Sequence, residues 1–157
     1  MSYGLLARPR ETPLSQPPNF MSKLQSFEWG VQTARYAVQG AEALLRRVGE
    51  FEPNWDDAGS PAPRRAAIFN ASTALPALYL ASLATSHRWR SPHVSGSEQG
   101  EVSFEWWRDD RKLTMYFGDD TINVIKVWGP HIHDEMEEVD LHDAADFGPL
   151  WAWLHGD

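Results

Sequence analysis

The chain has 157 residues, of which 42% are hydrophobic, and it carries a formal net charge of −8 at pH 7. This length and apolar content predict one domain with its own core. The sequence contains no cysteine, which excludes disulfides and thiolate metal ligands and agrees with a cytoplasmic location. Its longest apolar run, residues 74–83, is shorter than the roughly 20 residues that cross a bilayer, so we expect no membrane contact.

Residues 1–22 contain four prolines among Arg, Ser, Thr and Gln, which predicts a disordered or extended arm. Residues 23–157 are expected to form the single domain. Residues 23–48 repeat apolar side chains at spacings of three and four and therefore predict a helix. A turn-rich loop follows, and residues 63–85 predict a second helix that Pro76 should kink or divide.

Residues 101–128 predict three consecutive antiparallel strands. Apolar residues alternate in 102–107 and 113–117, as in strands with one buried face. Residues 121–128 are almost continuously apolar, which favours a central strand covered on both faces. A short edge strand at residues 92–94 is compatible with its proline. We therefore expect an α+β fold, an antiparallel meander of three to four strands flanked by helices.

The C-terminal segment carries the negative charge. Residues 1–50 contain six basic and four acidic side chains, residues 51–126 eight and ten, and residues 127–157 none and eight. This distribution disfavours direct nucleic-acid binding and suggests a basic protein partner or, as a weaker alternative, mimicry of a nucleic acid. A solubilising acidic face is the simpler interpretation. Residues 131–140 are compatible with a strand or a loop, and Asp143 is a candidate cap for a late last helix, residues 144–155.

Several short motifs occur in a fixed order along the middle of the chain. They are Asn54-Trp55-Asp56-x-x-Gly59, a Leu/Ala-rich helix, Pro92-x-Val94 and Val102-Ser103-Phe104-Glu105-Trp106. This order resembles a loose group of small bacterial proteins that have an NWD-x-x-GA loop, one helix and an I-x-L-E-W strand opening a meander. Some members resemble one half of two-gene modules of toxin–antitoxin type, which implies an antitoxin-like role. The resemblance covers residues 53–128, so the N-terminal helix and the acidic C-terminal segment are departures from it.

The motif residues also have an architectural interpretation. Trp55 would pack under the sheet and Asp56 would accept backbone amides, so that the loop serves the fold and not a binding site. Glu105 and Trp106 would then be ordinary residues of a strand.

Eight tryptophans exceed what the core of one small domain easily holds. Trp106 and Trp107 are adjacent in a strand and must face opposite ways, so either helices cover the second face or it is an exposed aromatic platform. Indoles are favoured anchors in interfaces. We therefore predict a non-enzymatic protein that binds a protein partner, in the manner of an antitoxin, immunity protein or inhibitor. Its candidate contact residues are Trp107, Trp128, Asp134, Glu135, Glu137, Glu138 and Asp140.

The alternative is a metal-dependent enzyme. In a strand, His131 and His133 would share a face, and His142 would complete a three-ligand zinc or iron site. This spacing is less specific than H-E-x-x-H, and the chain has neither a nucleophile elbow nor a phosphate-binding loop. The main prediction therefore includes no catalytic residue and no cofactor.

Overall fold

The computed structural model describes residues 20–157, and residues 1–19 of the expected arm lie outside this range. The described elements are α1 (Phe20–Val48), α2 (Arg65–Ser82), β1 (His93–Gly96), β2 (Val102–Arg108), β3 (Arg111–Phe117), β4 (Ile122–Val127), β5 (Met136–Asp140), a 3-10 helix η1 (Ala144–Asp146) and α3 (Phe147–His155). The expected α+β class is confirmed, with five strands in place of three or four. Helix α1 begins three residues before the expected position. No helix within residues 20–157 has the length and hydropathy needed to cross a membrane.

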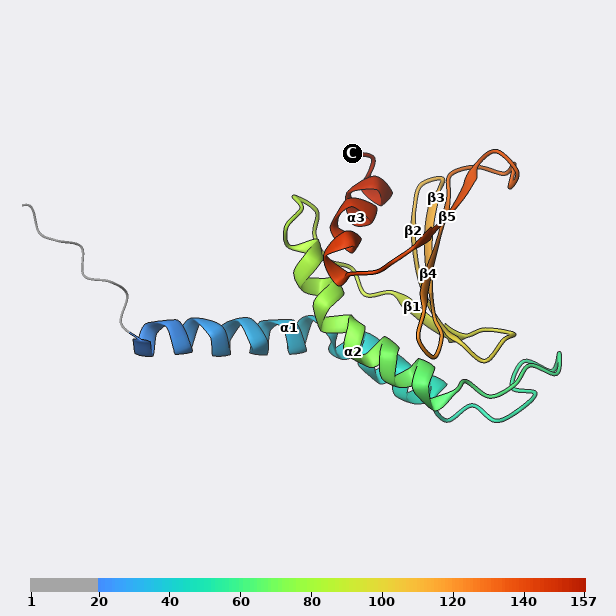
Figure 1. Ribbon diagram of the computed structural model, residues 1–157, viewed down its shortest axis with the longest axis horizontal. Coiled ribbons are helices and arrows are strands. Elements are labelled where there is room, and N and C mark those ends of the chain that lie inside the picture. Colours follow the sequence, from blue (N-terminus) through green and yellow to red (C-terminus); the bar gives the residue numbers. More distant parts are fainter. Residues whose placement is uncertain (1–19) are drawn as a thin grey trace, which may run out of the picture.

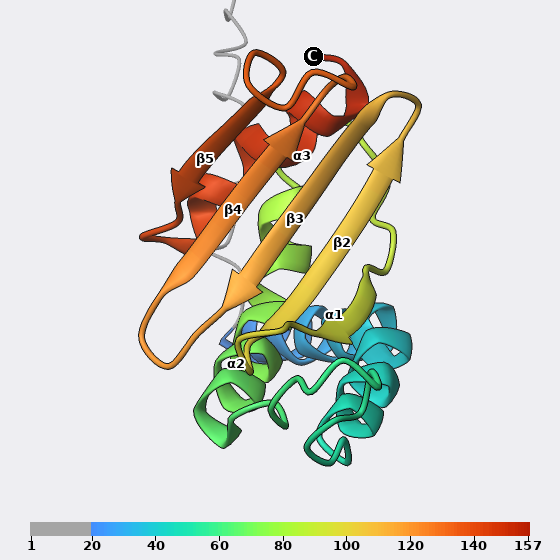
Figure 2. The ribbon, with the colours of Figure 1, turned by 90° about the vertical axis from the view of Figure 1, so that its right-hand side faces the viewer.

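The sheet is an antiparallel meander with the strand order β1-β2-β3-β4-β5 (Figure 2). Its register places Phe104 opposite Val94 and Met115, and Met115 opposite Val124. All four of these side chains are buried on the same face. Within each strand, the residues directly before and after these four point to the other face, because side chains alternate along a strand.

The helices lie on the apolar face of the sheet, and the other face carries none of them (Figures 1 and 2). Strand β4 is an interior strand as expected, paired with β3 and β5. The expectation that both its faces are covered is wrong, since Ile125 and Val127 belong to the helix-free face and are only partly buried. Helix α2 continues through Pro76, so the proline does not divide it. Figure 1 shows the helix axis turning partway along its length.

The core between helices and sheet is rich in aromatic rings. Trp106 and Trp151 are buried, with exposed fractions of 4% and 0%, and their rings meet edge to face at 5.9 Å. Phe147 lies 5.4 Å from the ring of Trp106, and Trp89 lies 5.7 Å from that of Trp151. The core therefore holds more of the indoles than the composition suggested.

The acidic C-terminal segment is part of the domain and not a separable extension. Strand β5 completes the sheet beside β4, and α3 contributes Phe147, Leu150, Trp151 and Leu154 to the core. The Asp143 carboxylate accepts the Ala145 N–H at 2.9 Å and so caps the 3-10 helix η1. Helix α3 begins only at Phe147, so the late start is confirmed, but its own N-cap, Asp146, makes no side-chain capping bond.

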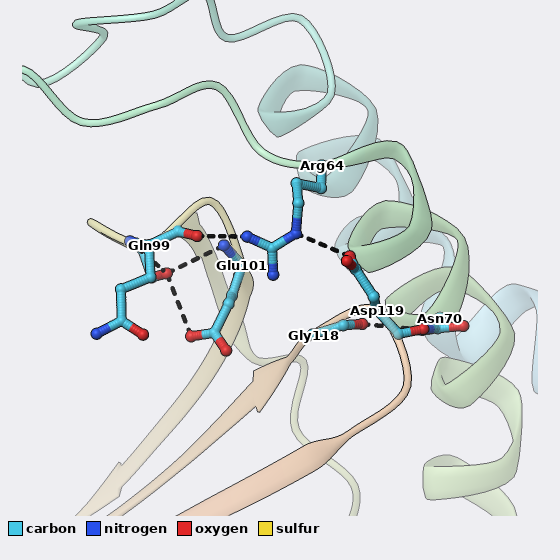
Figure 3. Close-up of polar contacts among 7 residues, drawn as sticks. Arg64, Asn70, Gln99, Glu101, Gly118 and Asp119 are labelled. Carbon is cyan, nitrogen blue, oxygen red and sulfur yellow. Dashed lines mark hydrogen bonds and ion pairs between the residues drawn. The ribbon is translucent and has the colours of Figure 1, made fainter.

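A polar junction ties the start of α2 to two turns of the sheet (Figure 3). The guanidinium of Arg64 donates to the Asp119 carboxylate at 2.8 Å and to the Gln99 carbonyl at 2.5 Å. The Asn70 amide donates to the carbonyls of Gly118 and Asp119 at 2.9 and 2.7 Å. These contacts fix the β1–β2 and β3–β4 turns relative to the helical layer, and the β1–β2 turn forms one end of the groove described next.

Candidate functional site

The helix-free face of the sheet is exposed and mainly polar. Trp107 lies on it with 49% of its surface exposed. The Lys112 ammonium sits 5.3 Å from the centre of its ring, and His93 lies 6.0 Å away. The structure has neither of the two arrangements expected for this face. No helix within residues 20–157 covers it, and Trp107 is the only indole that a strand contributes to it in the described chain, so the face is not an aromatic platform.

The half of this face that is nearer to the β1–β2 turn contains an open groove of about 760 Å³, which we call the acidic groove. Its floor consists of outward-facing residues of all five strands, and the loop of residues 51–63 and the β1–β2 turn border it. No Lys or Arg is among its lining residues, whereas five carboxylates are: Asp56, Glu98, Glu101, Glu105 and Glu138.

Few cations neutralise these carboxylates. Glu105 pairs with Lys112 at 2.6 Å, and Glu138 accepts a hydrogen bond from the amide of Asn123. Glu101 receives a long contact of 3.4 Å from the Ser97 hydroxyl. Within the described chain, Glu98 has neither an ion pair nor a side-chain hydrogen bond. The groove is therefore a region of negative potential, which favours a cationic ligand.

The loop that borders the groove is held by its Asn and Asp side chains. Asn54 has a φ of 68° and accepts the Gly59 N–H at 2.7 Å. Asp56 accepts the N–H groups of Ala58 and Ser60 at 3.1 and 3.2 Å, and the Ser60 hydroxyl at 2.5 Å. The Ser60 hydroxyl, followed by the two N–H groups, lowers the pKa of Asp56 despite some desolvation. The motif thus has the backbone role of the architectural interpretation.

Trp55 has a different position from the expected one. It stacks on Phe51 at 4.9 Å and donates its indole N–H to the Pro61 carbonyl at 3.1 Å. A Cβ atom on Gly96 would lie 3.2 Å from the Trp55 ring and 3.2 Å from Pro63. The ring therefore lies against the backbone of β1, at the margin of the groove and not under the sheet, and glycine permits this close approach.

The candidate contact residues fall in three places. Trp107, Glu138 and Asp140 belong to the open face by their strand register. Glu137 and Trp128 lie on the helix side, where Glu137 pairs with Lys126 at 2.6 Å and Trp128 packs on Trp153. The remaining two, Asp134 and Glu135, lie in the turn before β5. The Glu135 carboxylate accepts the His131 N–H at 2.8 Å and so closes this turn. The seven residues therefore do not form one surface.

The three histidines of the metal alternative are not brought together. His131 and His133 lie in the turn before β5 and not in a strand, while His142 follows the other end of β5. The five residues of that strand separate them by roughly 16 Å. No group of three His, Asp or Glu side chains within residues 20–157 is arranged to hold a metal ion.

Sequence reasoning missed most of the acidic groove. Glu98 and Glu101 are in the β1–β2 turn, and His93 and Tyr116 occupy outward positions of β1 and β3. The alternation of the strands was the available signal, because it places Ser103, Glu105 and Tyr116 on the face opposite the apolar residues.

Comparisons with protein-family models, curated proteins and solved structures find no match to this chain.

Proposed function

We propose that this protein is a non-enzymatic binding protein that receives a basic, extended segment of a protein partner in its acidic groove. The observation that carries the proposal is the open sheet face, which is hollowed and lined by five carboxylates without a Lys or Arg among the lining residues. The role would be that of an antitoxin, immunity protein or inhibitor, in line with the resemblance of residues 53–128 to a group with members in toxin–antitoxin-like gene pairs.

The shape and polarity of the groove favour a peptide segment over an apolar small molecule. Small-molecule sites are mostly apolar and enclosed, whereas this groove is open and its walls carry carboxylates, hydroxyls and amides. An extended chain with lysine or arginine at alternate positions would direct its cations toward the strands, since its side chains also repeat every two residues. Complementary charge also accelerates encounter and selects against acidic partners.

The weaker alternative, mimicry of a nucleic acid, uses the same carboxylates against a nucleic-acid-binding partner. It differs in one observable property, because polynucleotide would compete with this protein for the partner's basic surface. Competition therefore separates the two functions once a partner is in hand.

The test uses the full chain and two synthetic peptides, one alternating lysine with serine and the other alternating glutamate with serine. Isothermal titration calorimetry should detect saturable binding of the lysine peptide only, and added sodium chloride should weaken it by screening. Equal binding of both peptides, or an affinity independent of salt, would contradict the proposal.

A matched pair of variants locates the binding. The double substitution Glu98→Gln and Glu138→Gln removes two groove carboxylates and should weaken binding of the lysine peptide about fivefold, since an exposed pair contributes about 0.2–1 kcal/mol and two contribute about 1 kcal/mol. The control, Glu28→Gln with Glu50→Gln, changes the net charge equally at residues that do not line the groove and should leave the affinity within about twofold. Equal losses in both doubles would mean that only net charge matters and would refute the placement.

A further inference from the structure

A second, smaller cleft lies at the other end of β2, and we call it the arginine cleft. It has a volume of about 170 Å³. Strand β1 pairs with β2 only as far as Glu105, so the last three residues of β2 have a strand neighbour on the β3 side alone. The segment at Arg90 and the last turn of α3, which includes His155, close the space left beside this free edge.

The arginine cleft gathers positive charge in a protein with a net charge of −8. Arg90 and Arg108 line it, and within residues 20–157 no ion pair joins either guanidinium to a carboxylate. The only acid in the lining, Glu105, is already paired with Lys112 at 2.6 Å. Arg90 and Arg108 therefore retain their full donor capacity.

The same positive charges also affect the pKa of His155. Partial burial is the main cause that lowers the pKa of its imidazole, and the hydrogen bond to the Trp151 carbonyl opposes this change. The positive charges of His87, Arg108 and Arg90 lower the pKa further. His87 stacks on His155 at 4.4 Å and is itself paired with Asp157 at 2.5 Å, so Arg90 and Arg108 are the permanent cations whose charge lowers the pKa of His155.

Trp151, one of the residues that line the cleft, carries a buried donor without an acceptor in the part of the chain that the structure describes. Trp151 is fully buried and lines the cleft, and its indole N–H has no hydrogen-bond partner among residues 20–157. The neighbouring indole of Trp106, in contrast, donates to the Arg90 carbonyl at 2.8 Å. Folded proteins rarely leave a buried donor unpaired, so an acceptor supplied from outside the chain is the simplest explanation.

We propose that the arginine cleft binds a small oxyanion, a carboxylate or a phosphate group, through the guanidinium groups of Arg90 and Arg108, with the indole N–H of Trp151 as a further donor. Guanidinium groups present paired N–H donors that match both oxyanions. The volume admits only a small group, well below the roughly 300 Å³ at which drug-sized ligand pockets begin. The site is distinct from the acidic groove, with which it shares only the lining residue Glu105, and it takes a ligand of the opposite charge.

The experiment titrates the full chain, labelled with nitrogen-15, with sodium phosphate or sodium acetate at constant ionic strength held by sodium chloride. The Trp151 indole N–H signal, assigned by its loss in Trp151→Phe, should shift in a saturable manner with at least one of the two anions. A shift with phosphate alone identifies a phosphate site, with acetate alone a carboxylate site, and with both a general oxyanion site. No saturable shift with either anion overturns the proposal.

Substitutions of the two exposed arginines, with a control substitution at a nearby arginine, locate the site. Arg90→Gln and Arg108→Gln should each weaken binding about tenfold, as expected when one charge-assisted pair is lost. Arg88→Gln removes an equal charge from an exposed residue outside the cleft lining and should leave the affinity unchanged. Arg108→Lys keeps the charge and should recover part of the affinity. Undiminished binding in Arg90→Gln and Arg108→Gln, or an equal loss in the control, overturns the assignment.

Discussion

Replacing Trp151 by phenylalanine should cost far less stability than replacing Trp106 by phenylalanine, although both indoles are buried in one cluster. Their exposed fractions are 0% and 4%, and their rings lie 5.9 Å apart. They differ in their hydrogen bonds. The Trp106 indole donates to the Arg90 carbonyl at 2.8 Å, whereas the Trp151 indole has no partner within residues 20–157.

The magnitude follows from two terms. Each substitution removes roughly 40 Å³ of buried volume, which costs about 1–2 kcal/mol through the cavity and the lost transfer energy. Trp106→Phe also removes a hydrogen bond and leaves a carbonyl unpaired, which adds about 1–2 kcal/mol. Trp151→Phe instead removes an unpaired buried donor, whose burial costs about 1–3 kcal/mol. We therefore expect a loss of about 2–4 kcal/mol for Trp106→Phe and, for Trp151→Phe, a change between a loss of about 1 kcal/mol and a gain of about 2 kcal/mol.

Urea denaturation followed by circular dichroism measures both losses, provided that the slope with urea matches that of the wild type. The experiment should be run in chloride and then with added phosphate or acetate. An equal loss for the two variants in chloride would refute the reasoning, because it would mean that water pairs with the Trp151 indole. A loss of unfolding free energy in Trp151→Phe that grows only when an oxyanion is present would agree with oxyanion binding in the arginine cleft.

Two further substitutions and one deletion test the scaffold. Gly96→Ala brings a Cβ atom to 3.2 Å from the ring of Trp55 and should destabilise the protein by about 1–3 kcal/mol, measured by urea denaturation. Asp56→Ala should destabilise at neutral pH, because the Ser60 hydroxyl holds the pKa of Asp56 below its ordinary value of 3.8. Since the folded pKa is the lower one, this contribution is present above that value and is lost as the pH falls through the folded pKa, so the two melting curves should converge in acid. Deleting residues 129–157 should abolish the cooperative unfolding transition, because the deletion removes β5 and the core residues of α3; a cooperative transition in the truncated chain would contradict this.

The meander could be predicted from the sequence because its evidence is local. Leu113, Met115 and Phe117 alternate with polar residues, and all three are buried. Strand β5 gave a weaker signal, since Val139 is its only residue packed against the core. A polar edge strand has the same composition as a loop, so residues 131–140 were compatible with either structure.

The exposed apolar residues and the groove depend on contacts that periodicity does not contain. Trp29 and Tyr36 lie off the apolar stripe of α1 and are 75% and 82% exposed. The acidic groove joins residues of a loop, a turn and five strands, and only the pairing register places Glu138 two strands away from Tyr116. The orphan indole of Trp151 is likewise a property of packing, because its helical position predicts burial but not the absence of an acceptor.

Strand β2 links the two proposed sites and explains why their charges do not cancel. Glu105 lines both the acidic groove and the arginine cleft, and its ion pair with Lys112 at 2.6 Å occupies the one carboxylate among the residues that line the arginine cleft. Arg108 lies three residues further along the strand, or roughly 10 Å. The Glu105–Lys112 pair therefore separates a region that attracts cations from one that attracts oxyanions. Because both regions are anchored to the same paired strand, a ligand that engages both must present its opposite charges at a fixed spacing, which selects by geometry as well as by charge.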